Sequence, residues 1–203
     1  MTSVLTGDII KSRKVTDQDV WLKTLKSALE MLSRDASYYE VYRGDSFQIE
    51  CGDILDSFEY ALYIKASIKT IKGLDVRLAI GIGDKSYQGK TVSESNGEAF
   101  IFSGETFETL KKEKNNLKLQ TKNSELNTEL NLYFKLALIA MDNWTVNTAE
   151  IVKLSLEHPT MVQSDLAKLI GISQDAVSKR RKRAYLDEIL ELDLLYRQKI
   201  AQL

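Results

Sequence analysis

The sequence predicts an α+β fold in which an antiparallel sheet with helices is followed by an all-α unit. Three observations carry this prediction. Short apolar runs suited to strands alternate with stretches of helical periodicity in the first part of the chain. Gly44-Asp45 separates two short runs of alternating apolar residues, which is typical of a β-hairpin. From residue 124 onward, all predicted elements are helices.

The composition is that of an ordinary globular protein, with 43% apolar and 28% charged residues in a chain of 203. No apolar run approaches the roughly 20 residues of a membrane helix, and no signal peptide is apparent at the N-terminus. The single cysteine, Cys51, excludes an internal disulfide and a cysteine-based metal site. We therefore expect a cytoplasmic protein without a membrane partner.

Charge is distributed unevenly along the chain. Residues 161–184 hold six basic and two acidic side chains, a net charge of +4, whereas the rest of the chain carries −5. Such an asymmetry indicates two parts with different tasks.

The predicted elements of the first 82 residues follow the order strand, helix, hairpin, helix, strand. They comprise a strand over 3–10, a helix capped by Thr16 or Asp17, hairpin strands over 39–42 and 47–51, a helix from 54 to near Gly73, and a strand over 75–82. This is the ferredoxin-like order, an antiparallel sheet with two helices on one face. In it the first and third strands are central neighbours.

Two carboxylates meet in this arrangement. Asp8 lies near the end of the first strand and Asp45 lies on the hairpin tip, so both are expected at one edge of the sheet. Neighbouring carboxylates repel each other unless a proton or a cation lies between them. Mg²⁺ binds proteins through one or two carboxylates together with the oxygens of a phosphorylated ligand. The alternative is that both acids are plain turn residues.

At this point the residues resemble a known family. Gly7-Asp8-Ile9-Ile10, Gly44-Asp45-Ser46-Phe47 and the strand from Val76 to Gly83 are similar to class III nucleotidyl cyclases, whose layout the diguanylate cyclase and polymerase palm domains share. The resemblance covers about residues 3 to 110. It implies that Asp8 and Asp45 hold Mg²⁺ for a nucleotide triphosphate, with Ile9 contributing its backbone carbonyl.

The resemblance has a departure. Cyclases carry an Asn and an Arg on the helix after the last strand, expected here from about Ser93, and these positions fall on Ile101 and Glu105. An acid at a phosphate-binding position disfavours catalysis, so a nucleotide sensor is preferred over an active enzyme. Basic residues that could bind phosphate instead are Lys11, Arg13, Arg43 and Lys85, with solvated surface as the alternative.

The remaining chain indicates where the protein divides into domains. Alternating Leu117 and Leu119 predict an added edge strand, and residues 124–141 a helix that is either the last core helix or a connector. We expect a domain over 1–122, a connecting helix over 123–145 and a DNA-binding domain over 146–203, with the boundary near 142–146.

Residues 163–180 are similar to the helix-turn-helix of sigma-factor region four and of many bacterial regulators. A small residue, Ala167, allows two helices to cross, Gly171 makes the turn, and Ser173 caps the second helix. The second helix is expected in the major groove of DNA. The residues expected near base edges are Ser173, Gln174, Asp175, Ser178 and Lys179, and those expected at phosphates are Arg180, Lys182 and Arg183.

One position departs from this motif, because Arg181 stands where an apolar residue is usual. The alternative for this segment is a helical hairpin used for protein contacts. Residues 185–203 carry more apolar surface than a small helical module needs, so we expect burial against a second subunit or the N-terminal domain, and a homodimer.

The preferred function is a DNA-binding transcriptional regulator with a nucleotide-sensing and Mg²⁺-sensing N-terminal domain. The whole layout also resembles the small bacterial SatD-like proteins. Two alternatives stay open: an active nucleotidyl cyclase or nucleotidyltransferase tethered to DNA, and a non-catalytic interaction protein.

Overall fold

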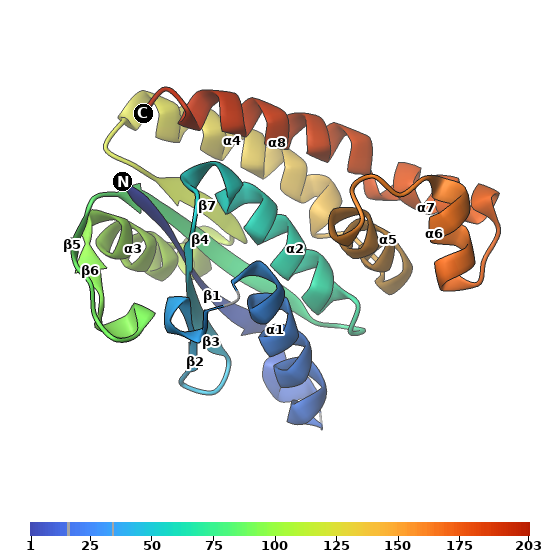
Figure 1. Cartoon of the computed structure of the whole chain (residues 1–203), viewed down its shortest axis with the longest axis horizontal. Helices are drawn as coiled ribbons and strands as arrows, with labels where there is room; N and C mark the ends of the chain where they lie inside the picture. Colours follow the sequence, from blue (N-terminus) through green and yellow to red (C-terminus); the bar gives the residue numbers. More distant parts are fainter. Residues whose placement is uncertain (16, 34) are drawn as a thin grey trace.

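The computed structural model describes residues 1–15, 17–33 and 35–203, and the predicted α+β class is confirmed (Figure 1). The strands are β1 (Thr2–Ile10), β2 (Tyr39–Tyr42), β3 (Ser46–Cys51), β4 (Asp75–Gly83), β5 (Lys85–Tyr87), β6 (Asn96–Gly97) and β7 (Leu117–Gln120). The helices are α1 (Gln18–Leu32), α2 (Ser57–Lys69), α3 (Glu98–Glu113), α4 (Ser124–Met141), α5 (Val146–Glu157), α6 (Gln163–Ile170), α7 (Gln174–Ala184) and α8 (Leu186–Ile200). Among these described helices, none is both long and apolar enough to cross a membrane.

The main sheet has the order β2-β3-β1-β4-β7. The central strand β1 is antiparallel to β3 and to β4, so the predicted neighbourhood of the first and third strands is confirmed. The sheet is mixed rather than wholly antiparallel, because β7 runs parallel to β4. A parallel return needs a long crossover, and the chain between β4 and β7 supplies one that contains α3.

Helices cover both faces of this sheet. On β1, Leu5 and Ile9 join the core beneath α1 and α2, while the alternate residue Val4 packs with Ala99 and Phe100 of α3 on the opposite face. The predicted sheet had helices on one face only. The third helix packs on the other face, where Val4 is buried and the hydroxyl of Thr6 donates to the hydroxyl of Ser103 in α3 at 3.0 Å.

The start of α3 differs from its predicted position near Ser93. The helix begins at Glu98, and the preceding Asn96–Gly97 pairs with β5 as a separate two-stranded sheet. The helix then lies so close to β4 that a Cβ atom on Gly81 would collide with the backbone of Ala99 and of Ser103. Glycine is therefore required here for close packing of a helix on a strand.

One cluster of buried apolar side chains extends from the sheet into the C-terminal helices. At its centre Phe58 of α2 stacks on Phe134 of α4 with ring centroids 4.8 Å apart, and Tyr196 of α8 is tilted against Phe58 at 5.7 Å. Tyr196 lies within residues 185–203, which were expected to pack against a second subunit or against the N-terminal domain. Its packing shows that α8 buries much of its apolar surface against the rest of this chain.

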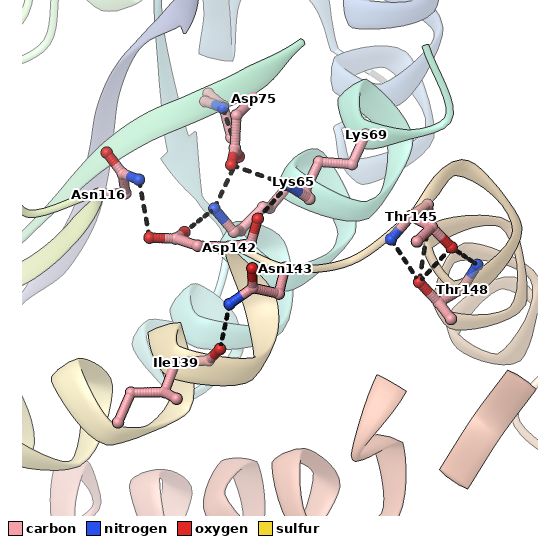
Figure 2. Close-up of polar contacts among 10 residues, drawn as sticks. Lys65, Lys69, Asp75, Asn116, Ile139, Asp142, Asn143, Thr145 and Thr148 are labelled. Atoms are coloured by element: carbon pink, nitrogen blue, oxygen red, sulfur yellow. Dashed lines mark hydrogen bonds and ion pairs between the residues drawn. The ribbon is translucent and has the colours of Figure 1, made fainter. Parts of the chain in front are cut away.

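The segment from Asp142 to Thr145, here called the elbow, joins α4 to α5 and coincides with the predicted domain boundary. Figure 2 shows that charged side chains converge on it: the buried Nζ of Lys65 donates to Asp75 Oδ1 and to Asp142 Oδ1, each at 2.7 Å. Lys69 Nζ adds a bond to the Asp142 carbonyl at 2.8 Å. The elbow is thereby tied to α2 and to the start of β4.

Two local predictions concern single residues. Asp17 caps α1, because its carboxylate accepts the backbone N–H of Asp19 at 3.0 Å, whereas Thr16, the other predicted cap, lies outside the described residues. Cys51 is buried as expected for a structural thiol, and its burial raises the pKa of the thiol. A raised thiol pKa disfavours the reactive thiolate.

Candidate nucleic-acid interface and acidic edge

The turn between α6 and α7 contains the glycine and the serine cap that the sequence predicted. Gly171 ends α6 in the left-handed conformation with φ of 78°. The N–H groups of Gly171 and Ile172 both donate to the carbonyl of Ala167, at 2.9 and 3.0 Å, which closes the helix end. Ser173 begins α7, because its hydroxyl accepts the N–H of Ala176 at 3.2 Å. Local chemistry alone thus fixes the turn.

The outer face of α7 is polar and exposed. It is formed by side chains at helical spacing, namely Gln174, Asp175, Ser178, Lys179, Lys182 and Arg183. Lys179 forms an exposed pair with Asp175 four residues earlier, at 2.7 Å. An exposed pair of this kind contributes little to stability, so both side chains are free to exchange partners.

The inner face of α7 is anchored to α5. Val177 is fully buried, and Arg180 donates to the carboxylate of Glu150 at 2.9 Å. Arg180 was expected at phosphates, but the structure places it in this partly buried ion pair because it lies on the side of α7 that faces α5. Arg181, which departed from the motif, donates to Ser155 and Asp187 at 3.1 and 2.6 Å.

The second site lies at one edge of the sheet. It consists of Asp8, Asp45, Ser12 and Arg77 and is called here the acidic edge. Asp8 lies on β1, and Asp45 lies in the hairpin turn directly before Ser46, which pairs in register with Asp8. The N–H of Ile9 donates to the carbonyl of Asp45 at 3.1 Å and fixes the hairpin tip beside β1.

Each carboxylate has a protein partner. Arg77 binds Asp8 in a two-pronged pair, with Nε to Oδ1 at 2.8 Å and a second bond from a terminal nitrogen to Oδ2. These hydrogen bonds, which Arg77 donates to Asp8, raise the pKa of the Arg77 guanidinium. The Asp45 carboxylate accepts the hydroxyl of Ser12 at 2.5 Å. A guanidinium ion therefore supplies the positive charge that two neighbouring acids require.

Sequence reasoning missed Arg77 and Ser12. Neither residue was assigned to a site. The signal that identifies Arg77 is cross-strand register: Asp8 lies directly opposite Arg77 in the β1–β4 pairing. Opposite charges facing each other across an antiparallel pair attract. The register depends on both strands and was not determined by either one alone.

The four basic residues proposed for phosphate binding are spread over the molecule. Arg43 takes the left-handed conformation, with φ of 51°, in the turn beside Asp45, and is exposed. Arg13 and Lys11 are exposed just beyond β1, where Lys11 also lines a cavity of about 450 Å³ with residues of the elbow. Lys85 lies at the other end of β4, paired with Glu50 at 2.6 Å. Lys85 therefore does not join the acidic edge.

The acidic edge provides a limited set of metal donors. In the described parts of the chain, no three His, Cys, Asp or Glu side chains gather closely enough to hold a metal ion. Two carboxylates do fit Mg²⁺ that is also bound by a phosphorylated ligand. Ile101 and Glu105, at the positions of the cyclase Asn and Arg, are exposed on α3.

Comparison with known proteins adds no further evidence on either site: no family model, curated protein or solved structure matches this chain.

Proposed function

We propose that this protein is a DNA-binding regulator, in which α6 and α7 act as a helix-turn-helix and α7 enters the major groove. The observation that carries the proposal is the exposed polar face of α7, with Lys179, Lys182 and Arg183 free of the core. In the same proposal, β1 to β4 with their helices are a ferredoxin-like unit, which the order β2-β3-β1-β4 supports.

The chemistry of this face suits DNA. Amide, hydroxyl and ammonium groups of Gln174, Ser178 and Lys179 are the donors and acceptors that read base edges in the major groove. Lys182 and Arg183, one turn further along, supply positive charge for phosphates, whose neutralisation releases counterions. Since Arg180 and Arg181 are held by acids or hydroxyls of the protein, the electrostatic contribution rests on the three exposed cations.

A charge reversal tests the proposal. We expect Lys179→Glu to weaken binding to a mixed-sequence 30-base-pair duplex about tenfold or more and to flatten its dependence on salt between about 50 and 200 mM KCl. Lys112→Glu, which reverses an exposed lysine at the end of α3, is the matched control and leaves affinity unchanged. Absence of salt-dependent binding by the unmodified protein, or equal affinity of Lys179→Glu, contradicts the groove placement.

We also propose that the acidic edge senses a nucleotide triphosphate together with Mg²⁺. The observation that favours it is that the hairpin turn places Asp45 beside the end of β1 that carries Asp8. Asp8, Asp45 and the Ile9 carbonyl would hold the metal, which would screen the negative charge of the phosphates. Arg77 must then release Asp8, and a released guanidinium beside bound phosphates is itself a good phosphate ligand.

This second proposal predicts competition between Arg77 and the metal. Titration with ATP and GTP, with and without Mg²⁺, is expected to give metal-dependent binding that Asp8→Asn and Asp45→Asn abolish. Arg77→Met frees the Asp8 carboxylate and is expected to tighten binding of Mg²⁺ alone. If Arg77→Met leaves Mg²⁺ binding unchanged, the acidic edge is a structural ion pair. Turnover of the nucleotide would favour the enzymatic alternative.

A further inference from the structure

The helix α4 has two apolar faces, and only one of them is covered. Its inner face, with Leu130, Phe134 and Leu138, is buried on the sheet side. Its outer face carries Leu132, Leu136 and Ile139, which are 55%, 57% and 70% exposed. A helix that is apolar around most of its circumference is normally buried on both sides.

The uncovered face continues onto α8. A groove of about 790 Å³ runs between the two helices and is lined mainly by apolar side chains, among them Leu136, Ile139, Tyr185, Leu192 and Leu195. Large apolar patches are rare on monomeric proteins and mark interaction sites. We therefore expect a binding partner to cover the patch formed by the outer face of α4 and this groove.

The charges at the rim favour a second copy of the same chain. Exposed Lys135 lies along the α4 side of the patch, whereas exposed Glu188 and Glu191 lie along the α8 side. Lys135 on the α4 side is opposite in charge to Glu188 and Glu191 on the α8 side, so these groups attract when α4 of one copy faces α8 of another. Isologous contacts of this kind are the usual basis of two-fold dimers.

The direction of the two helices fixes which residues of α4 and α8 lie at the same level. They are antiparallel neighbours, since Lys199 of α8 pairs with Glu129 of α4 at 2.8 Å and Trp144 donates to the Ala184 carbonyl at 2.9 Å. A two-fold axis parallel to both helices keeps each residue at its level along them. Lys135 then falls within about one helical turn of the partner's Glu191.

We propose that this chain forms a two-fold dimer through the α4–α8 face, with the axis parallel to these helices. Figure 1 shows α6 and α7 at one end of the α4–α8 pair. This axis leaves both α7 helices at the same end of the dimer, as binding of two half-sites on one duplex requires. An axis across the helices would place them at opposite ends. The choice of axis, but not the dimer, rests on the proposed DNA binding.

Sedimentation of the full chain without DNA tests the interface. We expect a dimer at about 10 μM for the unmodified protein and monomers for Leu136→Glu and Ile139→Glu, with unchanged circular dichroism. The matched control is Leu169→Glu, because Leu169 of α6 is 55% exposed but lies outside the patch, and this variant stays dimeric. A monomeric unmodified protein, or dimeric patch variants, overturns the proposal.

Charge exchange tests the axis. Lys135→Glu and Glu191→Lys are each expected to weaken the dimer about tenfold, and the double variant to restore it, because the two residues attract across the interface. Equal dimerisation in all three variants overturns the parallel axis. A dimer that binds no DNA would contradict the proposed function but not the interface. A monomer that binds DNA would contradict the interface but not the proposed function.

Discussion

Lys65 shows how much one residue contributes to the link between the sheet and the C-terminal helices. It is 1% exposed, and its ammonium group contacts the carboxylates of Asp75 and Asp142. A buried ammonium ion is tolerated only when its charge is compensated, because desolvation costs several kcal/mol. Lys65 therefore connects α2, β4 and the elbow through charge rather than through apolar packing.

Replacement of Lys65 is expected to destabilise the protein strongly. Lys65→Met leaves two partly buried carboxylates without this cation and should lower the free energy of unfolding by about 3 kcal/mol. The measurement is urea denaturation at pH 7. Lys72→Met, at an exposed lysine just beyond the same helix, should change stability by less than about 0.5 kcal/mol. A loss below about 1 kcal/mol for Lys65→Met would contradict the role of this residue.

Asp193 predicts a specific dependence of stability on pH. Burial raises the pKa of its carboxyl group above the ordinary 3.8, and the neighbouring Arg197 opposes this shift. The folded state therefore holds the proton more tightly than the unfolded state, so the contribution of Asp193 to stability is largest below pH 3.8 and is lost as pH rises through the folded pKa.

The difference in unfolding free energy between the unmodified protein and Asp193→Asn isolates this contribution. It should fall as pH increases from about 3.5 to 7 in urea titrations, whereas the difference for Glu105→Gln, at an exposed position of α3, should stay flat. A difference for Asp193→Asn that rises with pH would show that Arg197 outweighs burial.

At the scale of elements, the approach of α3 to β4 depends on glycine. Gly81→Ala introduces a methyl group into the backbone of α3 and should destabilise the fold by about 2 kcal/mol. Gly104→Ala is the matched control, because a Cβ on Gly104, within α3, meets no atom within 4 Å. It should stabilise the helix by about 0.5 kcal/mol, and thermal unfolding distinguishes the two. Equal effects of the two substitutions would mean that α3 moves away from β4 and accommodates the methyl group.

Some elements follow from local sequence alone. The α6–α7 turn lies where Gly171 and Ser173 place it, and α4 has its predicted bounds, because caps, glycines and helical periodicity act within a few residues. The start of α3 was misplaced because no side chain caps it: the residue before Glu98 is Gly97, with φ of 145°. That conformation is set by contact with β5.

At the scale of the whole molecule, the sheet and the C-terminal helices share one core. Apolar side chains of β1, α2, α4, α7 and α8 belong to the same buried cluster, and the elbow is held by the Lys65 and Lys69 contacts. A shared core of this kind couples the unfolding of both parts.

Single-tryptophan variants test this coupling. Trp21 reports on α1, and Trp144 reports on the elbow; both are buried. We expect Trp21→Phe and Trp144→Phe proteins each to unfold in one urea transition, whose fluorescence midpoint coincides with that of circular dichroism of the same variant. If the Trp144 signal changes at clearly lower urea than the helical signal, the two parts are independently stable domains.

The sequence by itself determined the hairpin, the convergence of Asp8 and Asp45, the α6–α7 turn and the exposed cations of α7, since these follow from turn chemistry, strand order and helical spacing. Only the tertiary structure decided that Arg77 neutralises Asp8, that Arg180 pairs with Glu150, that β7 is parallel, and that Lys65 is buried. Each of these depends on partners distant in the chain. Their energies arise from burial and register, which no local pattern encodes.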